Sequence, residues 1–397
     1  MKKVLLLILG VGLFTLTGCD SDGTNSSKFD EKSVEEKVDY HIENMTIEEK
    51  IAQLLIVYYN GSKFDETLRN SLETNQPGGF IMQGVNITTY EDTLNYVKQI
   101  KETSKVPMFV SIDQEGGIVQ RLYNLQDIKP TYIPAMYEVG QTNDEELAYE
   151  VGELMAKELR TIGVNVTYAP VIDVFTNEEN TVIGKRAFGR DAQTVIDMAI
   201  PLSKGLSDNM VIPVFKHFPG HGDTYLDSHY DLPIVEKTLE ELRKLELSPF
   251  KSAIENNALM IMTGHIAYPN ITGDNTPATL SYKMITEVLR EELGYDGVVI
   301  SDALNMGALT RNYSNSEIYE MAINAGVDIL LMPNSSSAET IRLIKESVKK
   351  GNITEDRINQ SLRRILTLKY EHLESGIFLG QGYLNIKEHQ EVINKIK

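Results

Sequence analysis

Short apolar segments alternate with helical patterns along most of this chain of 397 residues. Eight segments are predicted to be buried strands: 54–59, 79–82, 108–112, 164–171, 212–215, 259–262, 297–300 and 328–332. Helical patterns follow most of them, for example at 90–102, 192–208, 238–256, 281–293 and 336–350. Short buried strands that alternate with helices form a parallel sheet, and eight repeats indicate a closed α/β structure. The pattern therefore predicts a single (β/α)8 TIM-type barrel. An open doubly wound sheet is the competing fold, but no G-x-G-x-x-G turn opens a helix after a strand.

Two helix starts are marked by capping signals. Thr46, with Glu49 three residues later, predicts a capping box that opens an amphipathic helix. Thr142 with Glu145 predicts a second capping box, whose helix runs toward Gly163 as a C-terminal cap.

The N-terminus has the pattern of a targeting segment. Lys2 and Lys3 precede an apolar stretch at 4–16, which is shorter than the about 20 residues that span a bilayer. The Leu-Thr-Gly-Cys sequence that ends at Cys19 resembles a bacterial lipoprotein signal, in which cleavage leaves a lipid-bearing cysteine. This resemblance implies anchoring through Cys19 at the extracytoplasmic face of a bacterial membrane. The alternative is an ordinary secretory signal. Cys19 is the only cysteine, so neither disulfides nor a thiol nucleophile are expected.

The chain is expected to divide into four parts: a signal peptide at 1–18, a polar tether at 19–36, the barrel at 37–375, and a C-terminal extension at 376–397 on or after the barrel. The net charge of −19 argues against a nucleic-acid partner, which would need a basic surface. It also argues against electrostatic adhesion to anionic lipid.

Unusual polar segments follow five of the predicted strands. They are 113–121 (DQEGGIVQR), Asp173 with 183–189 (IGKRAFG), the histidine-rich run 216–229, Thr263-Gly264-His265, and 301–308 (SDALNMGA). In a TIM-type barrel the loops at the carboxyl ends of the strands carry the active site. Five such segments in register therefore predict a site at that end of the barrel.

Asp302 and the histidine-rich run are the strongest catalytic candidates. Asp302 follows an apolar strand and is expected to face the barrel mouth, where Arg121, Arg186 and Lys216 would hold it ionised. Its alternative role is to cap the next helix. Asp227 and His229 share one side of an extended segment, so the carboxylate can orient the imidazole for proton transfer.

The histidine-rich run also permits a metal site. His217, at a strand end with Lys216, suits hydrogen bonding to a hydroxylated ligand, whereas a metal would use His217, His221, Asp223, Asp227 and His229. Phe-Pro-Gly between His217 and His221 prevents the helical His-x-x-x-His pair of zinc hydrolases, and Lys216 would repel the ion. We therefore expect neither a metal nor another cofactor.

Three motifs together resemble glycoside hydrolase family 3, specifically its β-N-acetylhexosaminidase branch. They are IDQEGGIVQRL (112–122), KHFPGHGDTYLDSH (216–229) and SDALNMGA (301–308), and the resemblance covers about residues 45–370. It implies that Asp302 is the nucleophile and that His229, oriented by Asp227, is the general acid/base. It also implies that Asp113, Arg121, Arg186, Lys216 and His217 bind the sugar.

The resemblance implies a retaining exo-β-N-acetylglucosaminidase that removes terminal GlcNAc from peptidoglycan-derived fragments (muropeptides) through a glycosyl-aspartate. Larger family members carry a second α/β domain, and some take their acid/base from it. We expect this chain to lack that domain and to take its acid/base from the barrel. A histidine with an ordinary pKa near 6.5 exchanges protons at neutral pH. The alternatives are a β-N-acetylglucosaminide phosphorylase, a metal-dependent hydrolase and a sugar-binding lipoprotein.

Overall fold

The computed structural model describes residues 29–225, 228, 230–332, 336–373 and 378–396. The predicted signal peptide and Cys19 lie outside the described residues, as do Asp227 and His229.

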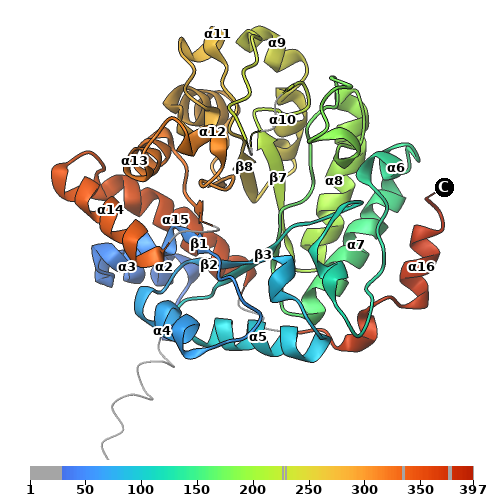
Figure 1. Cartoon of the computed structure of the whole chain (residues 1–397), viewed down its shortest axis with the longest axis horizontal. Helices are drawn as coiled ribbons and strands as arrows, with labels where there is room; N and C mark the ends of the chain where they lie inside the picture. The colour runs from blue at the N-terminus through green and yellow to red at the C-terminus, as the bar shows by residue number, and fades with distance from the viewer. Residues whose placement is uncertain (1–28, 226–227, 229, 333–335, 374–377, 397) are drawn as a thin grey trace, which may run out of the picture.

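A parallel barrel forms the centre of the molecule (Figure 1). Among the described residues, eight strands pair in the order β10-β1-β2-β3-β6-β7-β8-β9, and a parallel bridge between Ile300 and Ile329 joins the last strand to the first. The strands are β1 (Leu55–Val57), β2 (Gly79–Met82), β3 (Phe109–Ile112), β6 (Val166–Thr167), β7 (Ile212–Phe218), β8 (Met260–Thr263), β9 (Val298–Ser301) and β10 (Leu330–Met332). Each lies in or overlaps a predicted strand, so the predicted (β/α)8 barrel is confirmed. The sequence did not predict the antiparallel hairpin of β4 (Gln114–Gly116) and β5 (Val119–Gln120).

Helices surround the barrel, as Figure 1 shows. Their bounds are α2 (Val34–Asn44), α3 (Ile47–Gln53), α4 (Glu66–Asn75), η1 (Gly84–Asn86), α5 (Tyr90–Glu102), η2 (Arg121–Asn124), α6 (Met136–Gly140), α7 (Glu145–Thr161), η3 (Gly184–Arg186), α8 (Ala192–Asp208), α9 (Leu239–Lys244), α10 (Leu247–Glu255), α11 (Pro269–Thr272), η4 (Ala278–Leu280), η5 (Lys283–Glu292), α12 (Gly307–Thr310), α13 (Asn315–Ala325), α14 (Ser337–Lys350), α15 (Glu355–His372), η6 (Gln381–Tyr383) and α16 (Lys387–Ile393). Both α5 and α8 have the predicted bounds, whereas the helix predicted at 238–256 is divided into α9 and α10.

One of the two predicted capping boxes is correct. Thr46 accepts from the N–H of Glu49, whose carboxylate accepts from the N–H of Thr46. The predicted pair of Thr142 and Glu145 is wrong, because the side chain of Asp144 caps α7 by accepting from the N–H of Leu147. The Thr142 hydroxyl instead donates to the carbonyl of Val139, at the end of the preceding helix α6. A Thr-x-x-Glu pattern cannot reveal that a better-placed carboxylate lies between its two members.

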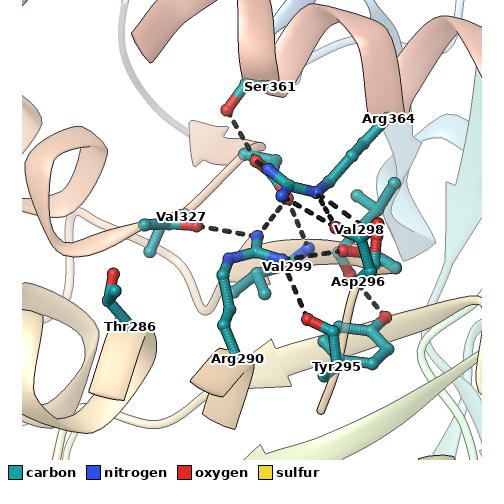
Figure 2. A network of polar contacts seen from close by, with 12 residues as sticks. Thr286, Arg290, Tyr295, Asp296, Val298, Val299, Val327, Ser361 and Arg364 are labelled. Atoms are coloured by element: carbon teal, nitrogen blue, oxygen red, sulfur yellow. Dashed lines mark hydrogen bonds and ion pairs between the residues drawn. The ribbon is translucent and has the colours of Figure 1, made fainter.

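A buried network of one carboxylate and three arginines lies near the amino ends of β9 and β10. Asp328 is fully buried, and its carboxylate contacts Arg290 at 2.6 Å, Arg357 at 3.4 Å and Arg364 at 3.5 Å. The Ser361 hydroxyl donates to this carboxylate at 2.6 Å. Figure 2 shows Arg290 on η5 and Arg364 on α15, the two helices from which these arginines reach the network. This network links both helices to the seam where β9 meets β10.

Residues 378–396 pack outside the barrel. Helix α16 lies beside α7 in Figure 1, and His389 Nδ1 is 3.0 Å from the buried carboxylate of Glu158. Within the residues that the structure describes, no helix combines the length and the apolar character that crossing a membrane requires.

Candidate active site

A cavity of about 420 Å³ opens at the carboxyl ends of the barrel strands. It is lined by Ile81, Gln83, Asp113, Glu115, Val119, Arg121, Tyr168, Val182, Arg186, Lys216, His217, His221, Ser228, Met262, Asp302, Ala303, Asn305, Met306 and Leu331. All six predicted site residues that the structure describes are in this set: Asp113, Arg121, Arg186, Lys216, His217 and Asp302. Their functional roles stay predictions, whereas their common location is a feature of the structure.

Glu115 lies at the centre of the cation cluster, although the sequence analysis assigned it no role of its own. Its buried carboxylate receives two hydrogen bonds from Arg186, Nε to Oε2 at 2.7 Å and Nη2 to Oε1 at 2.8 Å. Lys216 Nζ is 2.5 Å from Oε1 of the same carboxylate. Burial opposes the ionisation of Glu115, but the two cations outweigh it and hold its pKa far below the usual range. Glu115 therefore fixes both cations in the cavity wall.

Two cavity groups retain polar capacity for a ligand. Asp113 lies 3.5 Å from Lys216 Nζ, and its side chain is partly exposed. Arg121 lines the cavity, and its Nε is buried with no hydrogen-bond partner among the described residues. Because buried donors are nearly always paired in folded proteins, this one indicates a ligand acceptor or a water.

His217 is oriented by a buried carboxylate that precedes it by 44 positions. Asp173 Oδ2 is 2.7 Å from His217 Nδ1, while its Oδ1 accepts from the backbone N–H of His217 at 3.2 Å and of His221 at 2.6 Å. The carboxylate thereby fixes the ring of His217 and leaves Nε2 for a ligand. Burial opposes the ionisation of Asp173, but the two histidines outweigh it and lower its pKa.

His221 anchors the loop after β7. Its ring lies between Thr224 Oγ1, 2.7 Å from Nδ1, and Ser228 Oγ, 3.2 Å from Nε2. Burial and the nearby His217 lower the pKa of His221 to about 4, so the ring is neutral at neutral pH. Ser228, the residue between the predicted Asp227 and His229 pair, lines the cavity and accepts from the N–H of Ala308 at 3.2 Å.

Asp302 follows β9 and faces the same cavity. Its backbone N–H donates to Thr263 at 3.1 Å, and Oδ1 accepts from the N–H of Ala303 at 2.7 Å. Burial raises the pKa of Asp302, but the nearby His265 and His217 outweigh it and hold this pKa below its ordinary value. Lys216 contributes in the same direction, as predicted, whereas Arg186 is paired with Glu115. The alternative role as a helix cap is wrong, because α12 begins at Gly307 and Met306 is its N-cap.

His265, which lowers the pKa of Asp302, is itself held by two polar contacts. Its Nδ1 is 2.8 Å from Thr279 Oγ1 and its Nε2 is 3.1 Å from the carbonyl oxygen of Ala303. The sequence placed Thr263-Gly264-His265 after a strand but assigned it no role. Position at a strand end is the signal that marks His265, Glu115 and Asp173 alike; their partners are visible only in the fold.

The three described members of the considered metal set, His217, His221 and Asp223, make other contacts. Asp223 pairs with Lys237 at 2.9 Å and accepts from Thr176, while His217 and His221 make the contacts described above. In the part of the chain that the structure describes, no group of three or more His, Cys, Asp or Glu side chains is placed to hold a metal ion.

Comparisons with known proteins identify the family. The model described as "Glycosyl hydrolase family 3 N terminal domain" matches residues 46–368. The "Beta-hexosaminidase" of Nitrosospira multiformis is 33% identical over 295 residues, 73% of this chain and 82% of that protein. The "Beta-hexosaminidase A" of Pseudoalteromonas piscicida is 32% identical over 330 residues, and there the match spans 76% of this chain but only 55% of that protein.

A solved structure agrees with this assignment. A "glycoside hydrolase family 3 beta-N-acetylglucosaminidase" from Paenibacillus sp. str. FPU-7 superposes with a TM-score of 0.84 at 34% identity, covering 89% of this chain and 68% of that one. The family match covers most of the chain, and the (β/α)8 barrel carries the three motifs on one cavity. The chain therefore belongs to glycosyl hydrolase family 3 and is a glycoside hydrolase.

Proposed function

We propose that this protein is a retaining exo-β-N-acetylglucosaminidase whose nucleophile is Asp302. The observation that carries the proposal is an aspartate with a lowered pKa facing a cavity whose wall holds Lys216, Arg186 and His217. An ionised carboxylate can attack an anomeric carbon, and fixed polar groups can hold the sugar hydroxyls. The relatives named β-hexosaminidase and β-N-acetylglucosaminidase support the substrate class.

In the proposed first step, Asp302 attacks the anomeric carbon while a general acid protonates the departing glycosidic oxygen. This gives a covalent glycosyl-aspartate and a free aglycone. Water, deprotonated by the same group, then attacks the anomeric carbon and releases the sugar and Asp302. Asp113, Arg121, Arg186, Lys216 and His217 bind the sugar in this scheme, with Glu115 holding two of the cations in place.

We propose His229 as the general acid/base, with Asp227 orienting it. The support is the i, i+2 spacing of the two residues and the location of Ser228, the residue between them, in the wall of the cavity that contains Asp302. A histidine in this role also avoids placing another carboxylate beside the nucleophile.

Mass spectrometry after incubation with a slow fluorosugar inactivator tests the nucleophile. We expect one glycosyl adduct, located on Asp302, and no adduct on Asp302→Asn. An adduct on another residue, or inactivation without an adduct, would contradict the proposal.

Leaving-group dependence tests the acid/base. His229→Ala is expected to slow cleavage of alkyl glycosides about 10²–10⁴-fold, but to affect the first step with an activated aryl glycoside far less, because an activated phenol departs without a proton. Equal slowing of that step for both substrates would refute the role of His229. If glycosyl phosphate forms in place of free sugar when phosphate is added, the enzyme is a phosphorylase.

We further propose that the substrates are GlcNAc-terminated peptidoglycan fragments and that Cys19 is lipidated. Support comes from the Leu-Thr-Gly-Cys sequence and from the relative named "Beta-hexosaminidase LpqI" of Mycobacterium tuberculosis, 32% identical over 82% of that protein. Cys19→Ser should release the enzyme from the membrane fraction without changing its kinetic constants. Unchanged membrane attachment would contradict the anchor.

A further inference from the structure

Large apolar side chains are exposed on the loop that follows β3, next to the cavity wall. Ile118 is 87% exposed, Tyr132 is 52% exposed and Tyr123 is 37% exposed. Two residues of the same loop, Val119 and Arg121, line the cavity. We call Ile118, Tyr123 and Tyr132 the apolar shelf. Because Ile118 directly precedes Val119 and Tyr123 is two residues from Arg121, the shelf is carried by the same segment that forms part of the cavity wall.

The backbone under the shelf is tightly held by the amide of one glutamine. Gln120 Nε2 donates to the carbonyls of Gly117 at 2.8 Å and Ile133 at 3.0 Å, and its Oε1 accepts from the N–H of Ile133 at 3.0 Å. The N–H of Gly117 also donates to the carbonyl of Ile133 at 2.9 Å. The hairpin tip that carries Ile118 and the segment that carries Tyr132 are thus one unit.

Tyr132 lies between two buried residues. Ile133 follows Tyr132, and Thr131 precedes it. Thr131 donates its N–H to both carboxylate oxygens of Glu158 and its hydroxyl to Oε1 at 2.6 Å. Both Thr131 and Ile133 are almost fully buried, whereas the ring between them is exposed. The exposure of Tyr132 therefore occurs on a fixed backbone rather than on a loose loop.

The two tyrosine rings are also packed on each other. Their centroids are 5.6 Å apart with an interplanar angle of 78°, an edge-to-face contact. Lys129 Nζ lies 5.3 Å from the centroid of the Tyr123 ring and donates to the carbonyls of Tyr123 and Leu125. The shelf is therefore ordered before any ligand arrives, which lowers the entropic cost of binding.

We propose that the apolar shelf binds the sugar ring of the leaving group, that is, a hexopyranose aglycone. This proposal rests on the function proposed above and extends it. The transferred sugar occupies the polar cavity above Asp302, so a second ring joined to it must lie toward the rim. A pyranose presents an apolar C–H face, which packs on exposed aromatic and aliphatic side chains, and burial of that face favours binding. A fixed apolar surface beside a polar cavity can bind the C–H face of such a sugar.

Two substrates with the same transferred sugar and the same type of leaving oxygen test the shelf. Methyl β-N-acetylglucosaminide has no second ring, whereas N,N′-diacetylchitobiose has one. Tyr132→Ala is expected to lower kcat/KM for the disaccharide by about five- to tenfold and to leave kcat/KM for the methyl glycoside unchanged. The methyl glycoside also reports whether the variant is folded. Ile118→Ser, at a far more exposed position, should give the same split with a smaller effect.

Tyr383→Ala is the matched control, because Tyr383 is 43% exposed but lies in η6, outside the cavity loops. Tyr383→Ala should leave kcat/KM unchanged for both the disaccharide and the methyl glycoside. Equal loss with both substrates, or no loss with the disaccharide, would overturn the shelf. Wild-type enzyme that cleaves neither substrate would instead refute the proposed function and the shelf with it.

Discussion

Two buried carboxylates with cation partners lie at opposite ends of this barrel. Glu115, at the carboxyl ends of the strands, is bound by Arg186 and Lys216, and Asp328, near the amino ends of β9 and β10, is bound by Arg290, Arg357 and Arg364. Burial opposes ionisation of both, and in both the cations lower the pKa. The same pairing of a buried carboxylate with several cations therefore occurs at both ends of the barrel.

The difference lies in what else the cations contact. Lys216 and Arg186 line the cavity with Asp302. Arg290 instead donates to the carbonyls of Tyr295, Gly297 and Gly326, and the N–H of Val299 donates to Asp328. The first network places two cations in the cavity wall, while the second ties loops and helices to the barrel seam. In TIM-type barrels the carboxyl end carries function and the amino end carries stability. Matched substitutions at the two ends test this division.

Asp302→Asn should have the largest effect of all. The amide keeps the shape of the side chain but cannot form a glycosyl ester, so kcat/KM for an aryl N-acetylglucosaminide is expected to fall by at least about 10⁴-fold. The urea midpoint should change little. Substantial residual turnover, after contamination has been excluded, would assign the nucleophile elsewhere.

Asp328→Asn is the matched change at the other end. It leaves three arginines around a neutral group, so the free energy of unfolding is expected to fall by about 3–5 kcal/mol, measured by urea denaturation. Turnover per folded molecule should match the wild type when assayed at low temperature. A large loss of turnover in folded enzyme would show that the amino end also sets the geometry of the site.

Lys216→Met and Arg290→Met compare one cation at each end. If Lys216 contacts the sugar as proposed, its loss is expected to lower kcat/KM about 10²-fold, while Glu115 keeps its double contact with Arg186 and stability changes little. Arg290→Met should instead lower the free energy of unfolding and leave kcat/KM nearly unchanged, because three backbone carbonyls lose a hydrogen-bond donor. Similar kinetic and stability profiles for the two variants would remove the distinction between the networks.

Substitution of Lys369 should give the smallest effect, and it tests how the free energy of unfolding depends on pH. Its fully buried Nζ donates to Gln53 Oε1 at 2.8 Å and lies 5.0 Å from the Phe109 ring centroid, and burial lowers its pKa to about 7. The unfolded chain, with a lysine pKa near 10.4, binds more protons between these values, so stability rises with pH. We expect the contribution of Lys369 to increase the free energy of unfolding by about 2 kcal/mol from pH 7 to 9. Lys369→Met should abolish that increment, and an unchanged pH slope would contradict the assignment.

The barrel strands and the location of the candidate site could be predicted from the sequence because both depend on local patterns. Buried strands recur as short apolar runs, and the polar residues after them fall at one end of a parallel barrel, which is why Asp302 and Lys216 could be placed in one site. The Asp144 cap, by contrast, was missed because two helix-start patterns overlap there. The break between α9 and α10 was missed because the amphipathic pattern continues across it.

The order of the apolar and polar segments thus determined the barrel, the end at which the polar cavity opens and most of the residues that face this cavity. Only the tertiary structure decided which charges pair. Asp328 meets arginines 29 to 38 positions away, and Glu115 meets Arg186 across 71 positions. Such partners are selected by burial, because a carboxylate removed from water must find a cation wherever the closed sheet brings one near. Nothing in the local sequence around either residue records that choice.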